Sequence, residues 1–174
     1  MSGLTPECSD DELEVEALFD LCFGPGRTAL SSYRLREGNL PVPGLSMVAR
    51  DGDGILAGAV RYWPIMIGTA PSLLLGPIAV HPTRQGEGLG ASLILQTATK
   101  ASEYGWLRIL LVGDEPYYGR FGFHRRTGLE MPRPTNPERV LGRELQHGSW
   151  EEVVGVVTPA PHIIPMSNSI ASHG

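Results

Sequence analysis

The first periodic stretch of the chain, SDDELEVEALFDLCF at residues 9–23, places apolar side chains at helical spacing and predicts a helix. Ser9 and Glu12 have the spacing of a capping box at its start. The side chains expected on its buried face are Ala17, Leu18, Leu21 and Cys22. The segment FGPGR interrupts the pattern, and TALSSYRLREG at residues 28–38 then predicts a second, weaker helix that ends at Gly38.

Three β-rich runs follow. Residues 44–65 contain two of them, joined by Asp-Gly-Asp-Gly at 51–54, and this composition predicts two antiparallel strands in a tight hairpin. Residues 72–82, SLLLGPIAVHP, are nearly all apolar, as expected for a central strand that is covered on both faces. Gly76 and Pro77 interrupt this run. Because proline lacks the N–H that a strand donates to its neighbour, we expect a bulge or a splay there.

A glycine-rich turn, RQGEGLG at residues 84–90, comes next and precedes a predicted helix that runs to about Tyr104, with Gly105 as its stop. The expected buried face of this helix consists of Ala91, Ile94, Leu95, Ala98 and Ala101. The run WLRILLVG at 106–113 predicts another buried strand. A strand, a turn, a helix and a strand in this order predict a right-handed parallel crossover.

The remaining segments predict shorter elements: a short helix in EPYYGRF at 115–121, a strand in GFHRR at 122–126, and a last strand in SWEEVVGVVTP at 149–159. A chain of 174 residues that is 41% hydrophobic is long enough for one sizeable core. We therefore expect a single mixed α/β domain over residues 1–158, followed by a proline-punctuated tail at 159–174.

The net charge and the cysteine content limit which nucleic-acid and metal partners we expect. The formal net charge is −5, and the 14 lysine and arginine residues are scattered, so we expect no nucleic-acid partner. Cys8 and Cys22 lack the spacing of a zinc site, and no metal is expected. The N-terminus has no signal-peptide pattern and no apolar run is long enough to span a membrane, so the expected compartment is the cytoplasm.

The glycine turn has the composition of a phosphate site, because a helix N-terminus presents unpaired N–H groups and glycines let an anion approach them. A Walker loop is excluded, since no Gly-Lys-Ser or Gly-Lys-Thr ending is present. Gly86, Gly88 and Ala91 match the G-x-G-x-x-A spacing of a dinucleotide-binding turn, with Asp114 ending the next strand. Five residues between strand and first glycine, and too little α/β alternation afterwards, oppose that alternative.

Two motifs carry a family resemblance. RQGEGLGA after IAVHP resembles the pyrophosphate-binding signature Q/R-x-x-G-x-G/A of the GNAT N-acetyltransferase superfamily, with Gln85, Gly88 and Gly90 at the matching positions. YYGRFGF resembles the family's Y-x-x-x-G-F segment, matched by Tyr118, Gly122 and Phe123. The segments FGPGR, LREG, LLLGPIAVHP and LVGDEPYYGRFGF look like a bacterial subgroup of predicted acetyltransferases whose acceptors are mostly undefined.

The resemblance implies a mixed, mostly antiparallel sheet with a splayed central strand, flanked by helices, and acetyl-CoA as donor. It implies that the pyrophosphate rests on the turn and that the pantetheine pairs with the splayed strand. The turn residues concerned are Gln85, Gly86, Gly88, Leu89, Gly90 and Ala91, and the strand residues are Ile78, Ala79 and Val80. Arg84 is equally a phosphate ligand or a solvated loop residue. Family habit and the exposed final strand also predict a homodimer.

For the chemistry, Tyr118 is the expected acid that protonates the leaving thiolate, and backbone N–H groups near Ala79 and Val80 are candidates to stabilise an oxyanion. His81 and His124 are more simply strand-end histidines that face water, and Asp114 is equally a turn former. Three residues have packing interpretations: Cys22 is most simply a small core side chain, and Phe23 and Trp63 are either core or acceptor-cleft residues.

The expected function is an N-acyltransferase that passes the acetyl group of acetyl-CoA to a primary amine by direct attack. The acceptor stays open. Two alternatives remain: an acyl-CoA-binding module without turnover, and a nucleotide-binding oxidoreductase.

Overall fold

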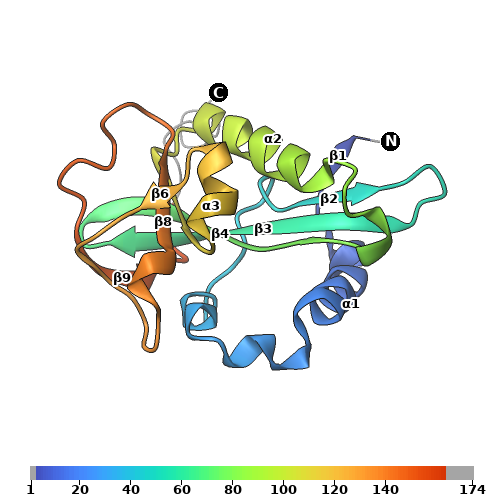
Figure 1. The fold of residues 1–174 in the computed structure, drawn as a ribbon, viewed down its shortest axis with the longest axis horizontal. Coiled ribbons are helices and arrows are strands. Elements are labelled where there is room, and N and C mark those ends of the chain that lie inside the picture. The colour runs from blue at the N-terminus through green and yellow to red at the C-terminus, as the bar shows by residue number, and fades with distance from the viewer. Residues whose placement is uncertain (1–2, 164–174) are drawn as a thin grey trace.

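The computed structural model describes residues 3–163 and contains a twisted sheet between helices (Figure 1). The strand order within these residues is β1-β2-β3-β4-β5-β8-β6, and β9 pairs with both β3 and β7. The strands are β1 (Leu4–Pro6), β2 (Met47–Arg50), β3 (Leu56–Ile67), β4 (Ala70–Val80), β5 (Arg108–Val112), β6 (His124–Arg125), β7 (Leu129–Glu130), β8 (Val140–Glu144) and β9 (Gly155–Pro159). The helices are α1 (Glu12–Phe23), α2 (Leu89–Glu103) and α3 (Glu115–Tyr118).

Helices α1 and α2 cover opposite faces of the sheet, over the long strands β3 and β4 (Figure 1). Because both faces are covered, β3 and β4 are buried along most of their length, as their continuous apolar sequences predict. The larger cluster lies beneath α2 and includes Tyr62, Leu93 and Phe123. A smaller cluster beneath α1 includes Val15 and Phe19.

The mixed, mostly antiparallel sheet expected from the sequence is confirmed. β4 and β5 run parallel across the α2 crossover, as predicted, and the short pair β7 and β9 is also parallel. The other strand pairs of the described residues are antiparallel. The doubly wound parallel sheet that a dinucleotide-binding oxidoreductase would need is therefore not formed, so that alternative is wrong.

Central strand β4 is interrupted where Gly76 and Pro77 stand. Its ladder with β3 shifts register between Val60 and Tyr62, opposite this point. Its parallel ladder with β5 comprises only Leu73 with Ile109 and Leu74 with Leu110. Beyond those pairs β4 and β5 diverge, which confirms the predicted splay.

The first helix is confirmed, but its predicted buried face is wrong in part. Leu18 is buried and Cys22 is half-buried, whereas Ala17 and Leu21 are exposed and Val15 and Phe19 take their place. A short 3-10 turn, η1 (Ser9–Asp11), precedes the helix, and the N–H of Cys8 donates to the Asp11 carboxylate at 3.0 Å. The capping box therefore lies one residue upstream of the predicted position, at Cys8 and Asp11.

The second helix, predicted over residues 28–38, does not form. Two 3-10 turns, η2 (Pro25–Ala29) and η3 (Ser31–Leu35), occupy this segment, and Leu30 between them has an extended backbone with ψ 145°. Only Arg27 and Leu35 are buried in the two turns. Without an apolar stripe the segment gains little from a helix, and packing decides its path.

In α2 the buried face is shifted as well. Ile94, Ala98 and Ala101 are buried as predicted, but Leu95 is 46% exposed, and Leu93 and Thr97 lie in the core. The Thr97 hydroxyl shares a hydrogen bond of 2.7 Å with the hydroxyl of Tyr62, which satisfies both polar groups in the core.

The last predicted strand is shorter than expected, because residues 149–152 form turns. The sequence did not indicate three of the strands, β1, β7 and β8. Strand β9 pairs with β3 on one edge and with β7 on the other. The exposed-edge argument for a dimer is therefore lost. Ala160, directly after β9, is buried and donates its N–H to Pro64 at 3.1 Å. Most of the predicted tail lies outside the described residues.

Candidate active site

The divergence of β4 and β5 opens two adjoining cavities. One, of about 550 Å³, lies against the glycine turn and is called the loop cavity; the other, of about 370 Å³, lies against α1 and the two 3-10 turns and is called the α1 cavity. Ile78, Tyr117 and Tyr118 line both cavities. These three residues therefore mark the junction between the two spaces.

The structure brings all ten predicted donor-binding residues to the loop cavity. Its lining includes Ile78, Ala79, Val80, Arg84, Gln85, Gly86, Gly88, Leu89, Gly90 and Ala91. The residues come from the end of β4, from the short turn η4 (Pro82–Arg84) and from the start of α2, which the glycine turn folds against one another.

The glycine turn presents a row of free backbone donors. Gly86 and Gly88 have φ of +88° and +79°, the left-handed region that glycine enters without strain, and Gly88 is the N-cap of α2. None of the seven N–H groups from Gln85 to Ala91 donates a hydrogen bond to another residue within the described range 3–163. These donors and the positive end of α2 suit the loop to an anion such as a pyrophosphate.

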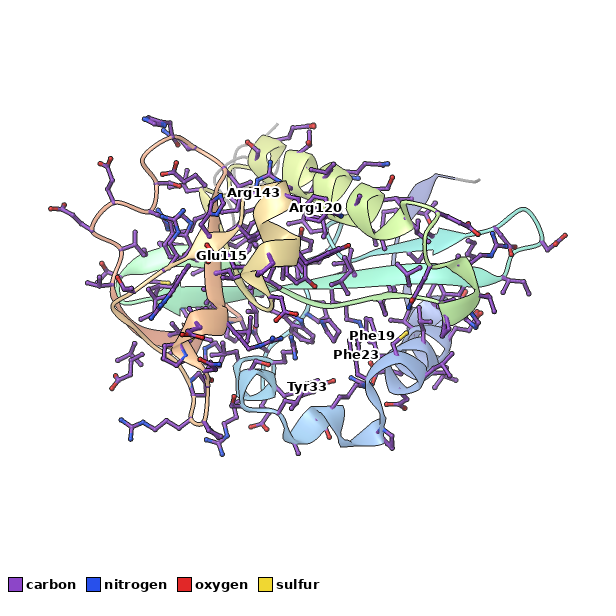
Figure 2. All side chains as sticks on the ribbon, viewed as in Figure 1. Phe19, Phe23, Tyr33, Glu115, Arg120 and Arg143 are labelled. Carbon is purple, nitrogen blue, oxygen red and sulfur yellow. The ribbon has the colours of Figure 1, made fainter. Side chains whose placement is uncertain are left out.

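Two arginines border this loop, and they differ in whether a carboxylate pairs with them. Arg84 forms ion pairs with Asp51 at 2.5 Å and Glu87 at 3.5 Å, so it ties the loop to the β2–β3 turn. Arg120 also lines the loop cavity and stacks over the ring of Tyr117 at 4.8 Å, without a carboxylate partner among residues 3–163. Figure 2 shows Arg120 next to α2. No feature of the sequence pointed to Arg120, because an arginine in a turn is usually solvated.

Strand β4 turns two backbone N–H groups toward the splay. The N–H of His81 donates to Ala57 at 2.8 Å, and Ala79 lies opposite Ala59 two residues further along the antiparallel ladder. Bonded pairs alternate in such a ladder, so Ala79 faces β3 while Ile78 and Val80 point their N–H groups to the opposite edge. Val80 and Ile78 are therefore the candidate oxyanion donors of this strand, whereas the N–H of Ala79 is directed toward β3.

Tyr118 ends α3 and lies at the junction. Its ring packs on Gly113, where a Cβ would come within 2.5 Å of Tyr118 Cε2, and it makes edge contacts with Tyr117 at 4.9 Å and Phe123 at 6.3 Å. Burial raises the pKa of Tyr118, with a smaller contribution from Tyr117. The phenol is thus protonated across the neutral range, and its hydroxyl has no hydrogen-bond partner among the described residues.

The other predicted candidates lie outside the junction. His81 accepts a hydrogen bond from the N–H of Thr83 at 3.2 Å, and exposed His124 lies 3.5 Å from Glu115, and neither lines a cavity. Trp63 is buried and donates its indole N–H to Gly76 at 2.6 Å. Cys22 packs in the α1 cluster, where burial raises the pKa of its thiol. These four positions fit the packing or turn interpretations.

Phe23 and Asp114, by contrast, line the α1 cavity. Phe23 at the end of α1 is half exposed, and Figure 2 shows it and Tyr33 on the α1 side of the sheet. Asp114 forms an ion pair with Arg139. Asp114 is the one carboxylate in the lining of this cavity as far as residues 3–163 define it.

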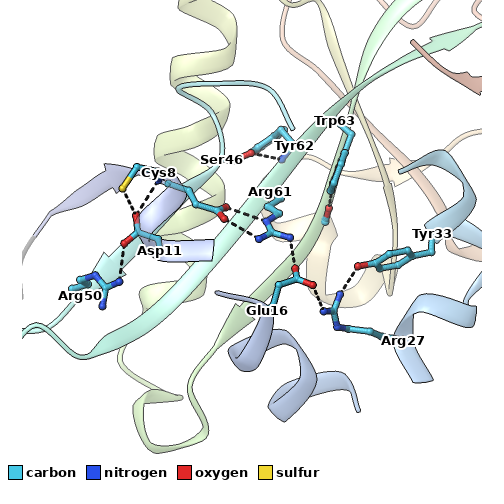
Figure 3. Close-up of polar contacts among 12 residues, drawn as sticks. Cys8, Asp11, Glu16, Arg27, Tyr33, Ser46, Arg50, Arg61, Tyr62 and Trp63 are labelled. Atoms are coloured by element: carbon cyan, nitrogen blue, oxygen red, sulfur yellow. Dashed lines mark hydrogen bonds and ion pairs between the residues drawn. The ribbon is translucent and has the colours of Figure 1, made fainter. Parts of the chain in front are cut away.

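A chain of ion pairs fixes the wall of the α1 cavity (Figure 3). Glu16 of α1 bridges Arg61 of β3 and Arg27 of η2, and Arg61 also pairs with Glu7 at 2.8 Å. Burial alone would raise the pKa of Glu16, but the hydrogen bonds from Arg27 and Arg61 outweigh it and hold that pKa below its usual value. The network attaches α1 and the 3-10 turns to the sheet.

Among residues 3–163 no group of three potential ligand side chains is placed to hold a metal ion. No helix in the same range has the length and apolar character to cross a membrane.

Comparison with known proteins agrees with this geometry. A model of the acetyltransferase (GNAT) domain family matches residues 43–125, which carry β2 to β6 with the glycine turn and Tyr118. The chain is 30% identical over 111 residues to the uncharacterized N-acetyltransferase YhbS of Escherichia coli K12, spanning 63% of this chain and 65% of that relative. The chain thus matches slightly less than two thirds of the length of this curated relative.

Two solved structures resemble most of the described fold. A GNAT family N-acetyltransferase, YhbS from Escherichia coli in complex with CoA, is 24% identical and has a TM-score of 0.79, covering 92% of this chain and 90% of its own. A GNAT family acetyltransferase from Brucella melitensis in complex with acetyl-CoA is 27% identical with a TM-score of 0.58, covering 86% and 97%. The likeness therefore extends well beyond the glycine turn.

Proposed function

Because the chain belongs to the GNAT N-acetyltransferase superfamily, we propose that it transfers the acetyl group of acetyl-CoA to a primary amine by direct attack. The observation that carries this proposal is the meeting of the two cavities at Ile78, Tyr117 and Tyr118. A donor in one cavity and an acceptor in the other would bring their reactive ends together beside the partly buried phenol of Tyr118.

The loop cavity fits the donor by its chemistry. The free N–H groups from Gln85 to Ala91 suit the pyrophosphate, and Arg120 offers a further charge for a phosphate. The N–H and C=O groups that β4 turns to the splay suit the amides of pantetheine, as in strand addition. Arg84 keeps the loop in place through Asp51.

In the proposed reaction the neutral amine attacks the thioester carbon, and the N–H of Val80 or Ile78 stabilises the negative charge on the carbonyl oxygen. The carbon–sulfur bond then breaks, and the sulfur takes its proton from the Tyr118 hydroxyl. The amine loses its extra proton to water in the α1 cavity. Asp114 is already paired with Arg139 and is not needed for that step.

The test is a panel of amines with acetyl-CoA, covering polyamines, amino acids, peptides and aminoglycosides, with released CoA thiol as the readout. Turnover with any amine supports the proposal. Tight binding of CoA in calorimetry without turnover of any amine would instead identify a CoA-binding module.

We further propose that the protein works in the cytoplasm, where thiols stay reduced, since both Cys8 and Cys22 are free. A homodimer stays a prediction that rests on family habit alone, and the absence of a nucleic-acid partner stays a prediction from the net charge of −5.

A further inference from the structure

The charges that line the α1 cavity are unequal in number. Three arginines, Arg27, Arg36 and Arg139, face the single carboxylate of Asp114. Arg27 is neutralised by Glu16 at 2.9 Å and Asp20 at 3.0 Å, and Arg139 is neutralised by Asp114. The charge of Arg36 is therefore the one that remains.

Arg36 has few partners for a guanidinium in a cavity wall. Its Nε donates to the carbonyl oxygen of Gly76 at 3.2 Å, and the group stacks over the ring of Tyr33 at 4.9 Å. The guanidinium has five N–H donors, and the four on its two terminal nitrogens make no hydrogen bond or ion pair with the described residues. No carboxylate in residues 3–163 pairs with it.

The surroundings make this lone charge costly. Burial is the main cause that lowers the pKa of Arg36 to about 10, and the nearby charges of Arg27 and Arg61 lower it further. The guanidinium stays charged at neutral pH. A partly buried charge without a partner is unfavourable, and an anion that arrives from solution relieves that cost.

Arg36 is also well placed relative to the junction. Its Nη2 lies close to Gly76, 2.9 Å from where a Cβ would stand. Gly76 precedes Ile78 by two residues of β4, which is about 7 Å at the usual rise of a strand. An amino acid can span that distance when hydrogen bonds are formed at both of its ends.

We propose that the acceptor is a small amine that carries an anionic group, a carboxylate or a phosphate, and that the free face of the Arg36 guanidinium binds this group in the α1 cavity. The proposal rests on the acetyl-transfer function proposed above. The planar fork of arginine matches both anions bidentately. The cavity, about 370 Å³, holds a molecule of amino-acid size, and Phe23, Leu30 and Pro77 in its lining favour an apolar body.

The experiment compares matched acceptors on the wild-type protein. Leucine, phenylalanine and 4-aminobutyrate are each paired with their carboxamides, and phosphoethanolamine is paired with ethanolamine. Each member is measured by thiol release with acetyl-CoA and by calorimetric titration in the presence of CoA. We expect the anionic member of at least one pair to be favoured about 10- to 100-fold in kcat/KM and in affinity, the range for a hydrogen bond to a charged group. The favoured pair distinguishes carboxylate from phosphate.

Variants then assign the preference to one side chain. Arg36→Met should abolish the preference for the anionic member of each pair, and Arg36→Lys should retain part of that preference. Comparing the preference between wild type and variant cancels the intrinsic reactivity of the amines. Arg34→Met is the matched control, because exposed Arg34 lines neither cavity and should leave the ratio unchanged. Circular dichroism and CoA affinity check that the variants fold.

The outcomes separate the two proposals. Equal use of both members of every pair by the wild-type protein, or no binding of any of them, overturns the anionic acceptor. A ratio that survives in Arg36→Met also overturns it. Selective, Arg36-dependent binding of the anionic members without thiol release supports the site and instead overturns the acetyl-transfer function.

Discussion

Replacing Tyr118 with phenylalanine removes one hydroxyl from the junction of the cavities and keeps the ring on Gly113 and beside Phe123. The hydroxyl has no hydrogen-bond partner among residues 3–163, so its loss leaves no buried group unsatisfied. We expect the free energy of unfolding to change by less than about 1 kcal/mol. The affinity for CoA should also stay near the wild-type value, because the free N–H groups of the glycine turn are untouched.

The turnover number should fall by about a hundredfold to ten-thousandfold, the usual contribution of a positioned general acid. The pH profile is the second readout. Because burial raises the pKa of Tyr118, the active protonated form persists past the ordinary tyrosine pKa of about 10, and the wild-type rate should decline only above that value. The alkaline decline therefore lies higher than the sequence alone suggests. The phenylalanine variant should lack it.

The assay follows thiol release with acetyl-CoA and an active amine from pH 7 to 11. Tyr104→Phe is the matched control, since Tyr104 caps the far end of α2 and lines neither cavity. Tyr117, which the motif alone would make a silent control, lines both cavities, and a Cβ on Gly90 would lie 3.3 Å from its hydroxyl. Full activity of Tyr118→Phe would refute the assignment and leave water or the acceptor as proton source. Loss only in Tyr117→Phe would show that Tyr117 is the acid.

Four further changes test other parts of the site. Gly113→Ala puts a Cβ 2.5 Å from the Tyr118 ring and should lower kcat about 10- to 100-fold without changing CoA affinity in calorimetry; an unchanged kcat contradicts the packing argument. Gly88→Asn should weaken CoA binding about tenfold; asparagine is chosen because it tolerates the φ of +79° better than a β-branched residue. Equal affinity of the wild-type protein for CoA and for dephosphorylated pantetheine would contradict the pyrophosphate site. Arg120→Met should weaken CoA binding by about tenfold and reduce its salt dependence; Lys100→Met removes a charge that does not line the loop cavity and serves as a control. Glu16→Gln should lower the free energy of unfolding in urea by about 1–3 kcal/mol, because two buried arginines lose a charged partner. Since folding lowers the pKa of Glu16, its stabilising contribution is present above the ordinary glutamate pKa and is lost as the pH falls through the folded value. An identical loss of stability with acid in the variant and the wild type would contradict this role of Glu16.

The local pattern of the sequence determined much of the donor side. Gly86 and Gly88 lie between a continuous apolar strand and a helical repeat, and both adopt left-handed φ angles that glycine enters without strain. Gly76 and Pro77 predicted the interruption of β4, because proline lacks the backbone N–H whatever its tertiary surroundings. All ten predicted donor-binding residues consequently line one cavity. The short strands β7 and β8 have no comparable local signal, and the sequence analysis missed them.

The acceptor side was decided by the tertiary structure. Residues 28–38 have weak helical periodicity, and the ion pairs of Arg27 with Glu16 and Asp20 hold that segment in 3-10 turns against the sheet. The buried face of α1 is likewise set by its packing, since Val15 and Phe19 lie in the cluster against the sheet and Ala17 and Leu21 are exposed. Arg36 is left without a carboxylate partner among residues 3–163 because the carboxylates of neighbouring elements pair with other arginines. Charge pairing between distant segments is a property of packing, so no single stretch of sequence specifies it.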